Sequence, residues 1–198
     1  MGYHFDKLYF VNGQIYAMDR YAIDSLEFND ALNSLTKGDP AVNTSYFNYG
    51  RTLYAAADGV VVETQDEHPE NSGNAKDVTF NSFKDYPGNF VLLDIGGGRY
   101  AFYAHCIPKS LQVKVGDHVK KGDPIALLGN SGYSSAPHLH FQITDKPDYF
   151  ATKGLPFVLK QYTKTGEIFL RTEASPRFLT PTSVTNSLME ETAVFSVE

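Results

Sequence analysis

The chain has very little cysteine: Cys106 is the only one among its 198 residues. A single thiol cannot form an internal disulfide, and it cannot supply the paired thiolates of a zinc knuckle. Any metal held by this chain must therefore be bound through His, Asp or Glu. Cys106 itself is expected to pack as a small hydrophobic side chain.

Long hydrophobic runs are also missing, although 42% of the residues are hydrophobic, a proportion typical of a globular protein. No run reaches the roughly 20 apolar residues of a membrane-spanning helix, so no membrane span is predicted. Residues 1–10 include His4, Asp6 and Lys7, which is not the pattern of a signal peptide. This leaves two readings, a cytoplasmic protein or one whose leader has been removed.

Positive charge is scarce as well. The 17 Lys and Arg residues are outnumbered by 23 Asp and Glu residues, for a formal net charge of -6. Binding nucleic acid through its phosphates requires clustered Lys and Arg, so nucleic acid is not expected as a partner. A helical HExxH motif is also absent, which excludes the common zinc-protease plan with its glutamate base.

What the sequence does contain is a series of short β-branched or aromatic runs bounded by turn residues, which predict strands. The clearest runs are residues 8–11, 59–62, 89–93 and 99–103. Gly96-Gly97-Gly98 is expected to turn between the last two, and Asn12-Gly13 predicts a hairpin near the start of the chain. Because no sustained helical stripe precedes residue 180, we expect a mainly β, antiparallel fold with little helix.

Residues 1–162 are predicted to form one β domain. Within it, residues 66–88 are polar and rich in Gly, Pro and Asn, and strands continue on both sides. We interpret them as a long loop beside the core. Residues 163–198 are predicted to be a C-terminal extension, because the periodicity weakens there. It could be an arm, a tail or a docking strand.

The most informative segment is residues 129–141, GNSGYSSAPHLHF. A Gly/Ser loop, expected to be flexible, leads to Pro137, and a strand is predicted from His138 onward. Residues two apart on a strand share a face, so His138 and His140 should point the same way while Leu139 enters the core. Such a pair suits a metal site or an acid/base pair. The alternative is a pair of solvated surface histidines.

The other polar candidates have ordinary roles when each is taken alone. His105 ends an apolar strand, where a capping or solvated histidine is common, and Asp24 follows a strand-like run as a turn initiator would. His4 lies near the terminus. His68 and His118 lie in polar loops, and we predict no role for either.

Five stretches taken together resemble the lysostaphin/LytM-type zinc metallopeptidases of bacterial cell walls. They are RYAID (20–24), LYAAADGVVVE (53–63), GNFVLLDIGGGRYAFYAH (88–105), VKVGDHVKKGDPIALLGNSG (113–132) and SSAPHLHFQI (134–143). The resemblance implies an antiparallel β-sheet, barrel-like core with a groove. It also implies a zinc-dependent endopeptidase that cleaves peptide bonds in peptidoglycan, in the periplasm, in the cell wall or as a secreted protein.

The resemblance further implies a role for each matching residue. Asp24 and His140 correspond to zinc ligands, with one zinc per chain. His105 and His138 correspond to the two histidines that flank the metal-bound water and the substrate carbonyl. Three N/O ligands would leave a fourth zinc position open for water.

One position departs from the family pattern. The family has a histidine four residues before the aspartate, and here that residue is Arg20. His4 is the candidate replacement for this third ligand. If Val11-Asn12-Gly13 forms a three-residue hairpin loop, His4 lies directly opposite Arg20, on the same face as Asp24.

Two other functions remain open. A non-catalytic member of the same fold could bind peptidoglycan or a protein partner. A biotinyl/lipoyl-type carrier is suggested by residues 113–125, VKVGDHVKKGDPI. Carriers present a modified lysine at a tight turn, usually between methionines. Met1, Met18 and Met189 flank no such lysine, which argues against the carrier.

Overall fold

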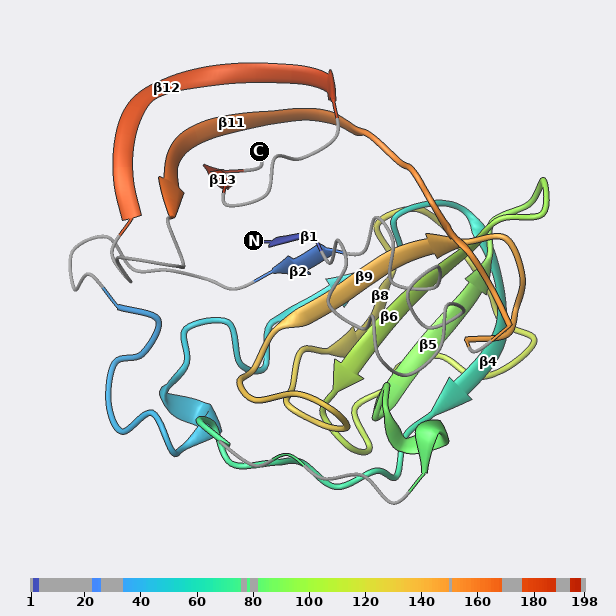
Figure 1. Ribbon diagram of the computed structural model, residues 1–198. Helices are drawn as coiled ribbons and strands as arrows, with labels where there is room; N and C mark the ends of the chain where they lie inside the picture. Colours follow the sequence, from blue (N-terminus) through green and yellow to red (C-terminus); the bar gives the residue numbers. More distant parts are fainter. Residues whose placement is uncertain are drawn as a thin grey trace.

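The computed structural model describes residues 2–3, 23–25, 34–75, 78, 82–149, 151–168, 176–187 and 193–196. Within them the chain forms sheets of eight, three and two strands (Figure 1). The described helical segments are two short 3-10 turns, η1 (Asn43–Ser45) and η2 (Phe83–Asp85). The predicted mainly β architecture with little helix is confirmed. No helix in the described part of the chain is long and apolar enough to cross a membrane.

The eight-stranded sheet carries the candidate site. Its order is β1-β2-β9-β6-β5-β4-β7, with β10 also pairing with β9, and every pairing is antiparallel. The strands are β1 (Gly2–Tyr3), β2 (Ile23–Ser25), β4 (Gly59–Gln65), β5 (Asn89–Asp94), β6 (Tyr100–Cys106), β7 (His118–Val119), β9 (Leu139–Thr144) and β10 (Gly154–Leu155). The predicted runs at 59–62, 89–93 and 99–103 fall in β4, β5 and β6. The run at 8–11 lies outside the described residues.

The predicted triple-glycine turn joins β5 to β6. Gly96, Gly97 and Gly98 all have positive φ, at 82°, 64° and 66°. Three successive residues in the left-handed region strongly favour glycine, because a Cβ atom is disfavoured in that conformation. The glycine run therefore sets the register in which β6 returns along β5.

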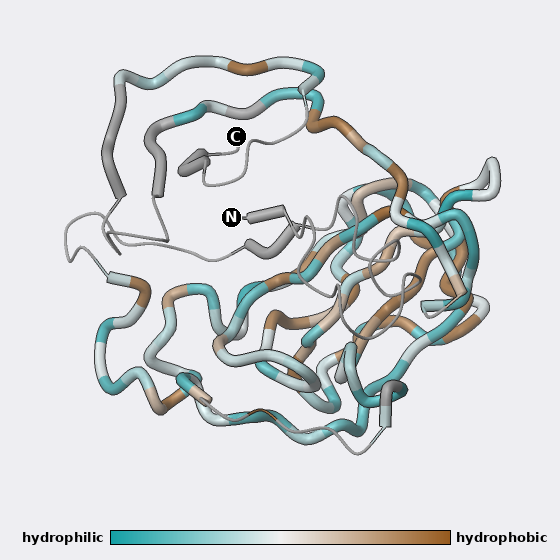
Figure 2. The backbone as a smooth tube through the Cα atoms, viewed as in Figure 1, coloured by the Kyte–Doolittle hydropathy of each residue, from teal (hydrophilic) through white to brown (hydrophobic). Residues whose placement is uncertain are grey.

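The two faces of the sheet pack against different neighbours. On β9, Leu139, Phe141 and Ile143 pack with the main hydrophobic core, as predicted for Leu139. The two-stranded sheet of β3 (Thr52–Tyr54) and β8 (Pro124–Leu127) contributes to the same core. Figure 2 shows hydrophobic stretches along the strands of the main sheet. Each fully buried Leu, Val or Phe side chain stabilises the fold by about 1.5–3 kcal/mol.

The opposite face is covered by a smaller apolar cluster of Phe90, Leu92, Phe102 and Ala104. Because side chains alternate along a strand, His140 and Gln142 of β9 lie on this second face. Cys106 belongs to the main core and is fully buried, as expected for a small hydrophobic side chain. Burial raises the pKa of its thiol to about 12.

The C-terminal part forms a sheet of its own. Its order is β12-β11-β13, with β11 (Leu159–Ile168), β12 (Pro176–Ser187) and β13 (Ala193–Ser196). Figure 1 shows this sheet, in orange and red, beyond the β1–β2 end of the main sheet. The boundary predicted between residues 1–162 and the C-terminal extension falls inside β11.

The predicted register of the first hairpin is wrong for the residues that the structure describes. Gly2 lies opposite Asp24 and Tyr3 opposite Ile23, whereas a regular three-residue loop would place Gly2 opposite Ala22. The register is shifted by two residues, because loop length alone does not fix the pairing when β2 is also paired with β9. His4, Arg20 and the predicted turn lie outside the described residues.

Candidate functional site

Three histidines predicted from the sequence come together on the second face of the sheet. The ring centroid of His105 lies 4.7 Å from that of His138 and 5.7 Å from that of His140. β6 and β9 bring them together, because Ala104 pairs with His140. His105 and His140 are almost fully buried, so the interpretation of His140 as a solvated surface residue is not supported.

His105 has an unusual backbone conformation. Its φ is 66°, in the left-handed region, which costs a non-glycine residue on the order of 1–3 kcal/mol. Two long-range hydrogen bonds hold it there: its amide donates to Pro87 O at 3.1 Å, and its carbonyl accepts from Gly129 N at 3.1 Å. A strained residue of this kind is more common at functional sites than elsewhere.

Hydrogen bonds determine which ring nitrogen of two histidines carries the proton. His105 Nδ1 lies 2.8 Å from Ser131 O, and His138 Nδ1 lies 2.8 Å from Ala136 O. A carbonyl oxygen can only accept, so both Nδ1 atoms must be the donors. In the neutral rings Nε2 then carries the lone pair, which makes it the basic nitrogen of both side chains.

A second contact orients His138. Ser134 Oγ lies 3.2 Å from His138 Nδ1 and donates to Asn130 Oδ1 at 2.6 Å. The Asn130 amide nitrogen donates to Ser72 O at 2.8 Å, so its oxygen is the acceptor in the Ser134 contact. With its proton directed at Asn130, the Ser134 hydroxyl turns a lone pair toward the Nδ1 proton of His138.

The loop before His138 was expected to be flexible, and that expectation is wrong. Asn130 and Ser131 are fully buried. The side-chain amide of Asn71 donates to Gly132 O at 2.7 Å, to Ser134 O at 2.9 Å and to Asn130 O at 3.1 Å. Because these contacts satisfy every second carbonyl from Asn130 to Ser134, the loop is held as part of the scaffold.

Further residues that sequence reasoning missed support the same loop. Glu70 accepts from Asn130 N at 2.8 Å and from the Tyr49 hydroxyl at 2.7 Å, and it forms an isolated β-bridge with Ser131. Burial and the Glu70 carboxylate raise the pKa of Tyr49. Ser131 Oγ in turn accepts from Asn89 N at 2.9 Å and donates to a β6 carbonyl. No local motif marks these residues, since each contact spans at least 21 positions.

The backbone of Asp24, on the neighbouring strand β2, lies directly opposite His140 on β9. Neither the Asp24 side chain nor any part of His4 is among the described residues.

The described side chains alone do not make a complete metal site. No group of three or more His, Cys, Asp or Glu among them is arranged to hold a metal ion. The rings of His105, His138 and His140 are therefore close together without forming a three-ligand set.

A row of aromatic side chains extends from His140 across the second face. Its members, in order of contact, are Phe102, Tyr149, Tyr86 and Tyr133. Phe102 meets His140 edge-on with ring centroids 6.3 Å apart and packs against Tyr149 at 4.9 Å. Tyr86 lies 6.0 Å from Tyr149 and stacks on Tyr133 at 5.0 Å. This aromatic row gives the surroundings of His140 an apolar floor.

Gln142 interrupts that apolar surface. It is fully buried two residues after His140, and neither its amide oxygen nor its amide nitrogen has a hydrogen-bond partner among the described residues. A buried amide without a partner costs on the order of 1–3 kcal/mol. Sequence reasoning did not single out Gln142, because a strand glutamine carries no local signal of burial.

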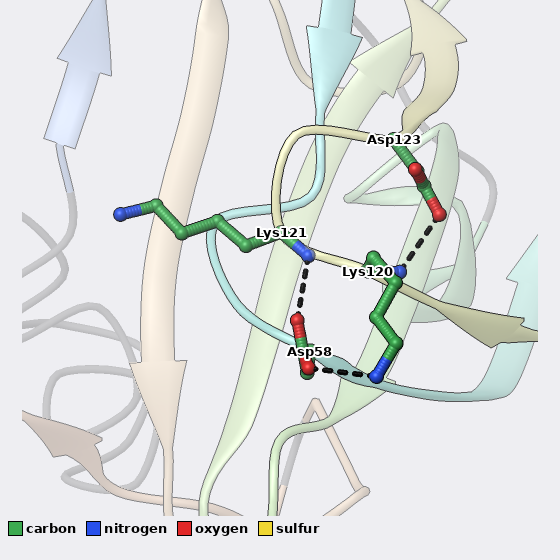
Figure 3. A network of polar contacts seen from close by, with 4 residues as sticks. All are labelled: Asp58, Lys120, Lys121 and Asp123. Atoms are coloured by element: carbon green, nitrogen blue, oxygen red, sulfur yellow. Dashed lines mark hydrogen bonds and ion pairs between the residues drawn. The ribbon is translucent and has the colours of Figure 1, made fainter.

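The segment that resembles a carrier turn has a structural explanation. Figure 3 shows Asp58 accepting from Lys121 N at 2.9 Å and pairing with Lys120 Nζ at 3.0 Å. Asp123 accepts from Lys120 N at 2.7 Å. These contacts lower the pKa of Asp58, with the Lys121 amide as the largest cause. They stabilise the turn between β7 and β8.

Comparison with known proteins adds family evidence. The model of peptidase family M23 matches residues 44–151, a range that includes His105, His138 and His140. The chain is 31% identical over 135 residues to the peptidoglycan DD-endopeptidase ShyA of Vibrio cholerae, covering 64% of this chain and 27% of that protein. An uncharacterized metalloprotease of Buchnera aphidicola is 30% identical over 128 residues, covering 64% of this chain and 29% of that protein.

Lysostaphin of Staphylococcus simulans is 47% identical over a shorter segment of 56 residues, which covers 28% of this chain and 11% of that protein. The chain thus spans less than a third of the length of these curated relatives. Among solved structures, the catalytic domain of lysostaphin from Staphylococcus simulans is 24% identical, with a TM-score of 0.40, covering 65% of this chain and 95% of that domain.

Proposed function

The chain belongs to peptidase family M23, and we propose that it is a zinc-dependent endopeptidase that hydrolyses peptide bonds in bacterial cell-wall peptidoglycan. The observation that carries the proposal is the pair of histidines, His105 and His138, whose Nδ1 atoms both donate to backbone carbonyls beside His140. Two basic Nε2 nitrogens next to a candidate metal ligand suit general acid–base catalysis of hydrolysis.

One zinc per chain is held, in this proposal, by His4, Asp24 and His140. The donor chemistry fits, because two imidazoles and a carboxylate leave one position of a tetrahedral zinc site open. The backbone pairing of Asp24 with His140 supports these two residues as ligands. When bound, zinc lowers the pKa of a coordinated water to about 7 and polarises the scissile carbonyl.

His105 and His138 move the protons. One accepts a proton at Nε2 from the attacking water, and the other donates to the leaving amine or stabilises the oxyanion. The imidazolium that forms on either ring is stabilised by the carbonyl bound at Nδ1, from Ser131 for His105 and from Ala136 for His138. The same hydrogen bonds restrict rotation of each ring, so Nε2 stays oriented for transfer.

The substrate class comes from the relatives. ShyA is a peptidoglycan DD-endopeptidase and ALE-1 of Staphylococcus capitis is a glycyl-glycine endopeptidase. Both names describe hydrolysis of a peptide bond, and we place this chain in that wider class. Peptidoglycan lies outside the cytoplasm, so the proposed location is the periplasm, the cell wall or the extracellular space.

A non-catalytic protein that binds peptidoglycan or a protein partner is the competing function. It is favoured by Arg20, which occupies the position where the family has a histidine ligand.

Incubation of purified peptidoglycan with the full chain separates the two functions. We expect zinc-dependent release of new amino groups, abolished by a chelator and restored by added zinc. Binding to peptidoglycan without any release of amino groups would support the non-catalytic function instead.

A further inference from the structure

Asn48 lies on the turn before β3, and its amide contacts the backbone next to His138. Its Nδ2 atom donates to Pro137 O at 2.7 Å, and both residues are buried. We propose that Asn48 is a positioning residue, which sets where the His138 imidazole stands in the site. The inference rests on the proposed function for the part that His138 plays in hydrolysis.

The oxygen that Asn48 binds restrains the backbone of His138 as well as that of Pro137. The Pro137 carbonyl and the His138 nitrogen lie in one planar peptide unit, so a hydrogen bond to the oxygen fixes the direction in which that plane faces. The Cα atom of His138 lies in the same plane, and the side chain leaves the backbone at that atom. The contact with Asn48 therefore restrains the starting point of the imidazole.

His138 depends on such a contact more than His140 does. His140 lies inside β9, where it pairs with Ala104 of β6, whereas His138 lies just before the strand. The His138 ring is oriented by Ala136 O at Nδ1, but that contact is local and moves together with the loop. Asn48 connects the same backbone to a part of the chain 89 positions away.

The turn that carries Asn48 is itself firmly attached. Arg51 N donates to Asn48 O at 3.1 Å, which closes the turn, and Gly50 within it has positive φ. Gly50 N donates to Leu128 O at 2.8 Å, and Leu128 N donates to Arg51 O at 2.9 Å. Leu128 directly follows β8 and belongs to the main core. The amide of Asn48 is thus presented by a support that is anchored in the core.

The other half of the Asn48 amide indicates why an asparagine stands here. Its Oδ1 atom is buried and has no hydrogen-bond partner among the described residues, which lowers the stability of the fold. Leucine has the same branching and would avoid this loss, but it could not donate to Pro137 O. A lysine could donate, but it would bring a buried charge close to His138. A short neutral donor with an unsatisfied oxygen fits a role in positioning.

Two substitutions at position 48 test the proposal. Asn48→Leu keeps the branching of the side chain and removes the donor. Asn48→Ala also removes it, with a side chain that fits even where leucine is too large. With soluble peptidoglycan fragments as substrate, we expect kcat to fall about 10- to 100-fold, the loss typical of a catalytic group displaced by about 1 Å. KM and the zinc content should stay unchanged.

Tyr46→Phe is the matched control. Tyr46 lies two residues before Asn48, is buried and donates through its hydroxyl to Gly73 O at 2.6 Å. The variant therefore also loses one buried hydrogen bond of the same segment, but one made to a different part of the chain. We expect it to lose thermal stability and to keep the wild-type kcat.

The ring of His138 gives a readout that does not depend on catalysis. Its Cε1–H resonance in a proton–carbon correlation spectrum is assigned by its absence from His138→Ala. We expect this resonance to shift or broaden in both position-48 variants and to keep its place in Tyr46→Phe. The resonance of His118, which is exposed, should not move in any of them.

The outcomes separate this inference from the proposed function. If the wild-type chain does not hydrolyse peptidoglycan, the proposed function fails, and a shifted His138 resonance in the position-48 variants still supports positioning by Asn48. An unchanged resonance overturns the inference, whatever the rates. Where the wild-type chain is active, an undiminished kcat in the position-48 variants, or an equal loss of kcat in Tyr46→Phe, overturns it as well.

Discussion

His105 combines a left-handed backbone with a buried imidazole. The backbone is held by Pro87 and Gly129, and the ring by Ser131. Such a conformation persists only where surrounding contacts compensate for its cost. At the scale of single residues, the site is therefore built by hydrogen bonds that orient each ring before any substrate arrives.

The proposed roles of the histidines predict separate effects on catalysis and on metal binding. His105→Ala and His138→Ala should each lower the rate of peptidoglycan hydrolysis by about 10² to 10⁴, the usual contribution of a general acid or base. Both should keep their zinc, measured by elemental analysis, whereas His140→Ala should lose it. His118→Ala, at an exposed position, is the control and should change neither. Loss of zinc from His138→Ala would contradict the assignment.

Gln142 makes a prediction about stability. Replacing a buried amide that lacks partners with an apolar side chain removes its desolvation cost, so Gln142→Leu should stabilise the fold by about 1–3 kcal/mol. Thermal or denaturant unfolding measures the change. Gln112→Leu is the matched control, because Gln112 is exposed and should show no gain. A large loss of stability in Gln142→Leu would mean that the amide is bonded in solution, for example to a buried water.

Two structural elements meet at the site: the loop that precedes β9 and the segment that precedes β5. The loop is attached by Asn71 and Glu70 from the long polar region 66–88. Gly88 and Gly132 touch backbone to backbone where the two elements cross, and both have positive φ. This close approach places the loop carbonyls under the imidazoles, so the polar region acts as a support for the site.

The close approach predicts a position-specific cost for a methyl group. Gly132→Ala should destabilise the chain by more than 1 kcal/mol and lower activity, because its Cβ would overlap the Gly88 backbone. Gly116→Ala is the control: Gly116 also has positive φ, but nothing lies within 4 Å of an added Cβ. Denaturant unfolding gives the loss in free energy of unfolding for each variant. The difference between the two losses is the cost of the overlap without the cost of the backbone strain. Equal costs would show that the contact between the two elements is unimportant.

Across the whole molecule, the proposed site draws on two separate parts of the chain. The family match begins at residue 44 and supplies all three imidazoles of the described site. The carboxylate comes from β2, which pairs with β9 at the edge of the same sheet. The antiparallel pairing of β2 with β9 thus connects a segment that precedes the family match to the matched domain. The proposed metal site depends on this pairing.

This arrangement predicts zinc-dependent folding of the β1–β2 edge. Chain purified without added metal should contain one zinc, and a ligand that binds only the folded state raises the apparent melting temperature. Asp24→Asn and His4→Ala should each lose zinc and the thermal shift. His68→Ala, an alternative histidine outside the site, should retain both. Full zinc content in His4→Ala would remove His4 from the ligand set and leave Asp24 and His140 with a different third partner.

The sequence alone determined the features that depend on short-range geometry. The period of two along a strand predicted that Leu139 enters the core while His140 lies on the other face; His138 lies just before β9. The glycine run at 96–98 predicted a turn between two strands, because left-handed conformations favour residues without a Cβ. These rules act over a few residues, so they can be read directly from the order of side chains.

Only the tertiary structure decided the rest. The support from Asn71 and Glu70, the left-handed backbone of His105 and the burial of Gln142 all depend on contacts between residues far apart in the chain. The pairing of Gly2 with Asp24 likewise differs from what the turn residues alone predicted. Such contacts are set by which strands pair and in which register, and that choice is made by the packing of the whole sheet.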